Sequence, residues 1–141
     1  MDVLLVETDR LVRDLIKVGL QQFPEFTVTC GQGYAAINEM RQRPYDVVFV
    51  GCDNGEGQCM LLLQHLRAFD RSTEVVVVCG QRTAREMHAE KSRLNVMSFV
   101  QTPVVELEFF RLLARLRSRQ TAAEPARGAT PARRPAPPAR V

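Results

Sequence analysis

Three carboxylates follow apolar, strand-like segments of the sequence and could together hold a divalent cation. Glu7 and Asp9 come directly after the run Val3–Val6, and Asp53 follows the apolar stretch Tyr45–Gly51. Carboxylate oxygens are the ligands that hard cations such as Mg²⁺ prefer in proteins. The carboxyl ends of neighbouring parallel strands meet at one edge of a sheet, where these side chains would converge. We predict no resident metal, and a weak cation site at Glu7, Asp9 and Asp53 stays open as the alternative.

The cysteines and histidines form no recognisable ligand set. Cys30, Cys52, Cys59 and Cys79 contain no Cys-x-x-Cys pair, so the sequence does not predict a zinc site. We expect four reduced, mostly buried thiols that pack as small apolar side chains. The two histidines stand alone on predicted helices, and we expect them to be solvated.

Strand-like and helix-like segments alternate through residues 1–119. Five segments have the length and β-branched content of strands: Val3–Val6, Phe26–Cys30, Tyr45–Gly51, Glu74–Cys79 and Met97–Val100. Five segments carry apolar residues at helical spacing: Leu11–Leu20, Ala36–Met40, Met60–Leu66, Thr83–Arg93 and Glu106–Arg119. In the first helix, the apolar residues at helical spacing are Leu11, Leu15, Val18 and Leu20. In the last helix, we expect the inward face to consist of Leu107, Phe110, Leu113, Ala114 and Leu116.

Strands that are joined by helical crossovers pair in parallel, and continuous apolar runs indicate burial on both faces. The predicted fold class is therefore α/β. We expect a doubly wound, five-stranded parallel sheet in the order 2-1-3-4-5, a flavodoxin-like three-layer sandwich.

The composition indicates an ordinary globular domain followed by a segment of another kind. Apolar residues make up 45% and charged residues 25%, and no apolar run approaches the length that crosses a membrane. The N-terminus lacks the basic region and cleavage site of a secretory signal, so we expect a cytoplasmic protein. Residues 120–141 hold four arginines and one glutamate, which leaves 15 basic (19 − 4) and 15 acidic (16 − 1) residues in positions 1–119. We expect residues 1–119 to be one domain with no basic surface for nucleic acid, and residues 120–141 to be a disordered Ala/Pro/Arg-rich tail or linker.

Four segments match one family in the order and spacing of their elements: VLLVETDRLVRDLI, YDVVFVG with its following loop and helix, VVVVCG, and SFVQTPVVELEFFRLL. On these segments, residues 1–119 resemble the receiver domain of bacterial response regulators in two-component signalling. The resemblance implies an aspartate at the end of the third strand that accepts a phosphoryl group from a histidine kinase. It also implies Mg²⁺ bound by neighbouring carboxylates, with a lysine and a hydroxyl on the phosphoryl oxygens.

The residues that this phosphorelay chemistry requires are missing. Gly51 stands at the position of the nucleophile, Cys79 at that of the hydroxyl and Thr102 at that of the lysine. Asp53 lies two residues too far along, a displacement of several ångströms at a rise of about 3.3 Å per residue, so we do not expect it to replace the nucleophile. We define the degenerate pocket as the residues at the strand ends: Glu7, Thr8, Asp9, Gly51, Asp53, Cys79 and Thr102.

We therefore predict a pseudo-receiver: an atypical, phosphorylation-independent signalling module that acts through protein–protein interaction, is not an enzyme and needs no cofactor. The resemblance implies a partner, or a homodimer, at the face of the fourth helix, fifth strand and fifth helix. That face carries Phe99, Glu108, Arg111 and Arg115, and Phe99 stands at the family's switch-aromatic position.

Two alternatives stay open. The chain could be the N-terminal regulatory domain of a transcriptional regulator or other effector, with nucleic acid contacted through the tail. With less support, it could be a flavodoxin-like cofactor binder. The loop ETDRL argues against the second alternative, because it lacks the glycines that cradle a phosphate.

Overall fold

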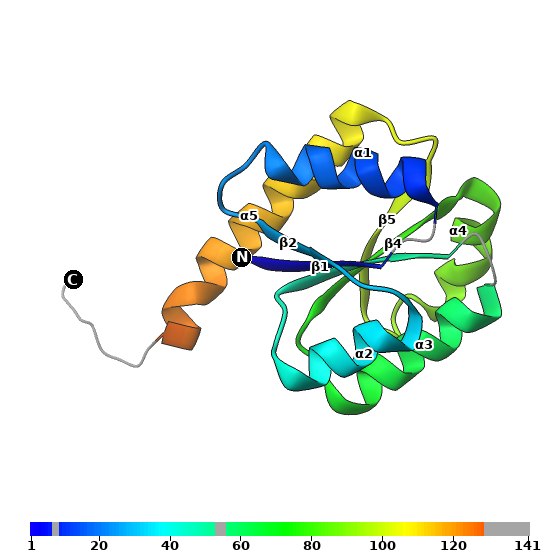
Figure 1. Cartoon of the computed structure of the whole chain (residues 1–141), viewed down its shortest axis with the longest axis horizontal. Coiled ribbons are helices and arrows are strands. Elements are labelled where there is room, and N and C mark those ends of the chain that lie inside the picture. Colours follow the sequence, from blue (N-terminus) through cyan, green and yellow to red (C-terminus); the bar gives the residue numbers. More distant parts are fainter. Residues whose placement is uncertain (7–8, 53–55, 129–141) are drawn as a thin grey trace. The chain divides into compact units, whose positions relative to one another are not determined.

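The computed structural model of the chain describes residues 1–6, 9–52 and 56–128. In these ranges the strands are β1 (Asp2–Val6), β2 (Thr27–Cys30), β3 (Val47–Gly51), β4 (Glu74–Gly80) and β5 (Val96–Thr102). The helices are α1 (Arg10–Gln21), α2 (Gly33–Gln42), α3 (Glu56–Phe69), α4 (Gln81–Met87) and α5 (Glu106–Gly128), with a single 3₁₀ turn at His88–Glu90 (Figure 1). None of these helices is long and apolar enough to cross a membrane.

The described strands form one parallel sheet in the order β2-β1-β3-β4-β5, which confirms the predicted fold class. Every strand pairs in parallel with its neighbours. This arrangement follows from the alternation of strands and helices, because parallel neighbours need a crossover that returns the chain to the same end of the sheet. All the strands therefore finish at one edge.

The sheet is buried on both faces between helices. The middle strand is β3, and in the neighbouring β4 the four valines at positions 75–78 are 0–1% exposed. On one face Val75 and Val77 belong to a cluster with Leu4, Val48 and the buried residues of α2, α3 and α4. On the other face α1 packs over β1 and β2, with Ile16 and Leu20 fully buried. Figure 1 shows α1 on the opposite side of the sheet from α2 and α3.

The buried face of α1 differs from the one that its leucines suggest. Ile16, Gly19 and Leu20 are buried, whereas Leu11, Leu15 and Val18 are 81%, 52% and 56% exposed. The reason is a close contact at Gly19, where an added methyl group would overlap the ring of Phe109. The absence of a side chain at position 19 lets the helix backbone approach that ring and fixes which side of α1 faces inward.

The structure divides into two compact units, Met1–Phe109, which holds the sheet, and the chain from Phe110 onward, which continues α5. The inward face that we predicted for this helix is wrong, because other residues of the helix are buried. Leu107 is 60% exposed and Ala114 is exposed, and the buried residues are instead Phe109, Leu112, Leu113 and Leu116. These four follow the i, i+3, i+4, i+7 spacing of one helix face.

The last helix runs past the predicted domain boundary. Residues 120–128, which we assigned to a disordered tail, continue α5 to Gly128. Ala122, Ala123 and Glu124 have high helix propensity and support this extension. Residues 129–141 lie outside the described ranges, and the domain boundary at residue 119 stays a prediction.

A buried arginine fixes the far end of α3. The side chain of Arg67 is only 5% exposed. Its guanidinium donates three hydrogen bonds to backbone carbonyls, from Nε to Leu94 at 2.8 Å, from Nη1 to Asp70 at 3.1 Å and from Nη2 to Asn95 at 3.0 Å. Burial lowers the pKa of Arg67, but an arginine stays protonated throughout the physiological range. The guanidinium thereby joins the end of α3 to the segment that leads into β5.

The turn after Arg67 is organised by Asp70. Its carboxylate accepts hydrogen bonds from the backbone N–H groups of Ser72 and Thr73 and from both of their hydroxyls. Partial burial alone would raise the pKa of Asp70. The hydrogen bonds from Thr73 and Ser72 stabilise the ionised form and outweigh burial, so the pKa lies below its usual value.

Replacing Val77 with aspartate should unfold the domain. The position is 0% exposed, so the substitution places an unpaired carboxylate between the helices and the sheet. The cost of several kcal/mol is comparable with a total stability of about 5–15 kcal/mol. The matched control is Val18→Asp on the exposed side of α1, which should change the free energy of unfolding by about 1 kcal/mol or less. Circular dichroism and thermal melts measure both, and a cooperatively folded Val77→Asp variant would show that β4 is not interior.

Asp70→Asn should alter the pH dependence of stability. Because the pKa of Asp70 is lowered on folding, its ionised form contributes stability above the unfolded pKa of about 3.9, and this contribution disappears as the pH falls through the lower folded value. Wild type should therefore exceed Asp70→Asn in free energy of unfolding at neutral pH, and the gap should narrow below about pH 4. Urea titrations at a series of pH values measure the gap. A difference in free energy of unfolding that stays constant below about pH 4 would contradict this role of Asp70.

Candidate functional site

The ends of the central strands meet at one edge, as the sequence predicts. Gly51, the last residue of β3, lies opposite Val78 of β4, and Gly80 lies opposite Thr102 of β5. The backbone N–H of Cys52 continues this pairing by donating to the carbonyl of Val78 at 2.9 Å. On the other side of β3, Val6 of β1 lies opposite Val50. The described part of the degenerate pocket therefore lies along the carboxyl ends of the strands, with Gly51 next to the switch point between β1 and β3.

The residues of the degenerate pocket are only partly within the described structure. Gly51 and Thr102 are half-buried, and Cys79 is fully buried in the apolar cluster. Glu7, Thr8 and Asp53 lie outside the described ranges. The structure therefore shows that the strand ends meet, and the position of Glu7, Thr8 and Asp53 beside them stays a prediction.

Asp9 has a structural role at the start of α1. Its Oδ1 accepts a hydrogen bond from the backbone N–H of Val12 at 3.1 Å, which caps the helix. Among the residues that the structure describes, no group of histidines, cysteines or carboxylates could hold a metal ion. The alternative cation site at Glu7, Asp9 and Asp53 stays a prediction, because two of its three residues are not described.

The described edge has little of the chemistry that phosphoryl transfer needs. Gly51 has no side chain and cannot act as a nucleophile. Cys79 is 0% exposed, and Thr102 carries no charge that could neutralise a phosphoryl oxygen. Thr102 is followed by Pro103 through a cis peptide bond. The described strand ends thus present backbone and hydroxyl groups to this edge, whereas the Cys79 thiol is buried in the apolar cluster.

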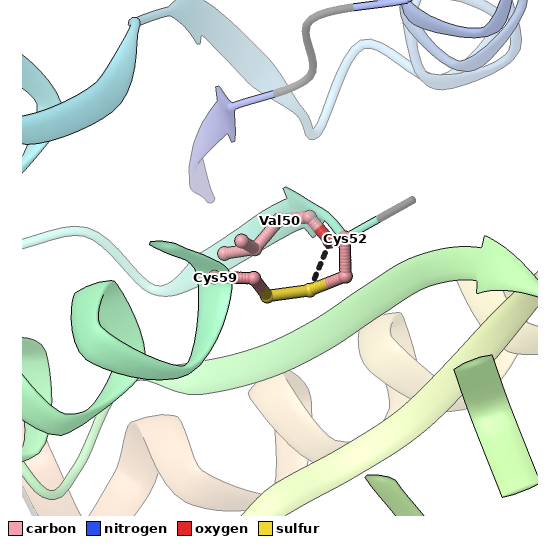
Figure 2. The surroundings of a disulfide bond; sticks show 3 residues. All are labelled: Val50, Cys52 and Cys59. Carbon is pink, nitrogen blue, oxygen red and sulfur yellow. Dashed lines mark hydrogen bonds between the residues drawn. A yellow bond between two sulfur atoms is a disulfide. The ribbon is translucent and has the colours of Figure 1, made fainter. Parts of the chain in front are cut away.

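A disulfide that was not predicted from the sequence joins this edge to α3. Cys52, one residue beyond β3, is bonded to Cys59 in the first turns of α3 (Figure 2). The prediction of four reduced, mostly buried thiols is therefore wrong for this pair, and Cys30 is exposed rather than buried. The signal was available in the spacing, since two cysteines seven residues apart flank a strand-to-helix connection that brings its ends together.

The expected switch aromatic lies partly inside the fold. Phe99 of β5 is half-buried and packs against the cluster on the α2–α4 side of the sheet. It lies opposite Val77, which connects it through β4 to the central strands. On α5, Glu108, Arg111 and Arg115 are all exposed.

The chain matches no protein-family model and no curated protein. Solved structures do match it. The regulatory domain of the repressor of iron transport regulator RitR, in its inactive form, is 18% identical with a TM-score of 0.70, over 83% of this chain and 95% of that one. The response regulatory domain of protein mrkE from Klebsiella pneumoniae is 16% identical with a TM-score of 0.73, over 86% and 99%.

A third structure represents a family of streptococcal redox sensors that evolved from two-component response regulators. It is 18% identical with a TM-score of 0.73, over 87% of this chain and 54% of that one, so the chain spans about half the length of that protein. At these identities the comparisons show the fold, and the chain has the fold of a response-regulator receiver domain.

A small phosphodonor should leave the chain unmodified. Because Gly51 offers no carboxylate, incubation with acetyl phosphate and Mg²⁺ should leave the intact mass unchanged. An intact receiver domain, treated in parallel, is the positive control for the phosphodonor. A phosphoryl adduct that maps to Asp53 or Glu7 would overturn the central interpretation of the pocket.

Proposed function

We propose that the chain is a phosphorylation-independent, receiver-like signalling module that acts through protein–protein contacts and is not an enzyme. The observation that supports this most strongly is Gly51 at the end of β3, paired with Val78 in the centre of a receiver fold. A receiver without a carboxylate there cannot form the acyl phosphate by which such domains change state. The remaining means of signalling is a surface that a partner recognises.

The surroundings of Gly51 support the same proposal. Cys79 on the neighbouring strand is buried among apolar side chains, where a phosphoryl group would be strongly disfavoured. Thr102 cannot supply the positive charge of a lysine. We propose a cytoplasmic location, which rests on the likeness of the fold to receiver domains.

We propose that the partner face is formed by α4, β5 and α5, with a protein partner or a second copy of the chain. It offers a half-buried aromatic, Phe99, and the exposed charges of Glu108, Arg111 and Arg115. On α4, Arg82 and Glu86 are exposed and form an ion pair at 3.4 Å. A mixture of aromatic and arginine side chains is characteristic of protein interfaces.

A second surface competes with this one. Leu11, Leu15 and Val18 form an exposed apolar stripe on α1, at the i, i+4, i+7 spacing of one helix face. Apolar side chains gathered on one exposed face are more often found at contact sites than elsewhere on a surface. This stripe is the alternative location for a partner.

The chain could instead be the regulatory domain of a larger regulator that contacts nucleic acid through residues 120–141. The similar structure that represents streptococcal redox sensors is about twice the length of the part that matches, which is the observation that favours this alternative. Its distinguishing property is nucleic-acid binding that weakens steeply with salt and disappears on truncation after Arg119. A flavodoxin-like cofactor binder remains the least supported proposal.

Charge reversal on α5 should weaken partner binding. The partner is first identified by cross-linking to the full chain. Its affinity is then measured for the wild-type chain and for the double variant Arg111→Glu, Arg115→Glu. Like charges placed against an interface cost several kcal/mol, so the dissociation constant should rise roughly tenfold or more. Sedimentation equilibrium on the same variant tests the homodimer. Both residues are exposed, so the fold should persist.

The matched control is Leu11→Glu, Leu15→Glu on α1. If the α4–β5–α5 face binds the partner, this control should bind as wild type does. The opposite result, with binding lost in the α1 variant and retained in the α5 variant, would move the interface to α1.

A further inference from the structure

We propose that Cys52 and Cys59 form a redox-active pair that responds to hydroperoxides at the edge where other receiver domains carry their phosphoryl group. The proposal goes beyond the proposed function by supplying an input to the module. Its chemistry concerns sulfur alone and does not depend on which surface binds a partner.

The positions of the two cysteines suit reversible bonding. Their Cα atoms are 5.3 Å apart, within the range of protein disulfides. Cys52 follows the last residue of β3, and Cys59 is the fourth residue of α3. The bond therefore ties the end of a central strand to the start of a helix across the connection that follows Gly51 (Figure 2).

The reduced state is also accommodated. The Sγ atom of Cys52 lies 3.9 Å from the carbonyl oxygen of Val50, as the dashed line in Figure 2 shows. A thiol can donate a weak hydrogen bond to that oxygen, whereas a disulfide sulfur carries no proton. Both sulfurs belong to the apolar cluster, where thiols pack as small hydrophobic groups. Neither state thus leaves a strongly polar group buried.

Burial selects the oxidant. Cys52 is 0% and Cys59 5% exposed, so a bulky disulfide reagent has poor access to either sulfur. Hydrogen peroxide is much smaller than such a reagent and is the oxidant that we propose. Cys59 is the more accessible of the two and is the fourth residue of α3.

The reaction balances with one peroxide. The Cys59 thiolate attacks one peroxide oxygen, the O–O bond breaks, and the departing hydroxide takes a proton to leave as water. The resulting Cys59 sulfenic acid is then attacked by the Cys52 thiolate, which forms the S–S bond and expels a second hydroxide that is protonated to water. Two thiols lose two electrons and two protons, and a dithiol reductant reverses the change by exchange.

The pair can affect the rest of the sheet through β4. The backbone N–H of Cys52 donates to Val78, next to Cys79, and Val77 on the same strand lies opposite Phe99. Closing the S–S bond restrains the backbone at Cys52 against α3, and opening it removes that restraint. The path from Cys52 to Phe99 crosses only paired strands.

The first test counts thiols in the full chain. The reduced protein, exposed to hydrogen peroxide and then alkylated under denaturing conditions, should react at only two of its four cysteines. Peptide mapping should find Cys52 joined to Cys59, and dithiothreitol should restore all four. Cys59→Ser should form no bridge, and the matched control Cys30→Ser, at an exposed free cysteine, should form it as wild type does. Alkylation of all four cysteines after peroxide, or a bridge that involves Cys30 or Cys79, overturns the proposal.

The second test determines whether formation of the Cys52–Cys59 bond changes the structure at residues away from the two cysteines. Amide NMR spectra of the oxidised and reduced forms should differ at Val78 and Phe99 as well as near the two cysteines. These shifts should be absent in Cys59→Ser. If the disulfide forms and opens while the amide chemical shift of Phe99 stays the same, the disulfide only stabilises the fold and the sensing role is wrong. A phosphoryl adduct from acetyl phosphate would instead overturn the proposed function and leave the sulfur result standing.

Discussion

Burial of β3 and β4 on both faces is the constraint on which the rest of the structure depends. Val48, Phe49 and the four valines of β4 are almost completely inaccessible to solvent. A strand that has no exposed face can carry only apolar side chains, because an unpaired polar group there costs several kcal/mol. Reactive groups can therefore lie only at the strand ends or on the outer surfaces of the helices. This is why the degenerate pocket lies at the strand ends.

The edge at the ends of β3 and β4 is unusual in the groups it contains. Acidic and basic side chains at such an edge must be kept hydrated or paired, since burial penalises each charge. In the described part of the chain, the sulfurs of Cys52, Cys59 and Cys79 are buried in the same apolar cluster as side chains of α2, α3 and α4. Sulfur tolerates an apolar interior and still undergoes covalent chemistry. A thiol pair can thus occupy a position where a set of charges would need solvent.

The sequence predicted the parts of the fold that local patterns determine. The strands, the crossovers and the sheet order follow from apolar runs such as Val75–Val78 and from the helices between them. The inward face of α1 was not predictable in the same way, because it depends on the contact between Gly19 and Phe109, which are far apart in the chain. Local spacing gives several equivalent faces when apolar residues are plentiful.

The sequence also predicted part of the candidate site. The strand ends that carry Gly51, Cys79 and Thr102 meet as the topology requires. The Cys52–Cys59 bond was missed, although the two cysteines lie only seven residues apart on either side of the connection from β3 to α3. Arg67 could not have been identified either. Its carbonyl partners at Leu94 and Asn95 lie 27 and 28 residues away, and no composition rule predicts a buried arginine.

The guanidinium of Arg67 also has a consequence for local unfolding. An edge strand normally opens more readily than the centre of a sheet, since it has a neighbour on one side only. Here β5 is preceded by carbonyls that Arg67 holds from the interior of α3. To separate β5 from β4 at that end, the chain must also release those carbonyls from a charged side chain that is almost fully buried. The edge strand and α3 therefore belong to one cooperative unit, and amide hydrogens at the start of β5 are protected by an interaction that lies outside the sheet.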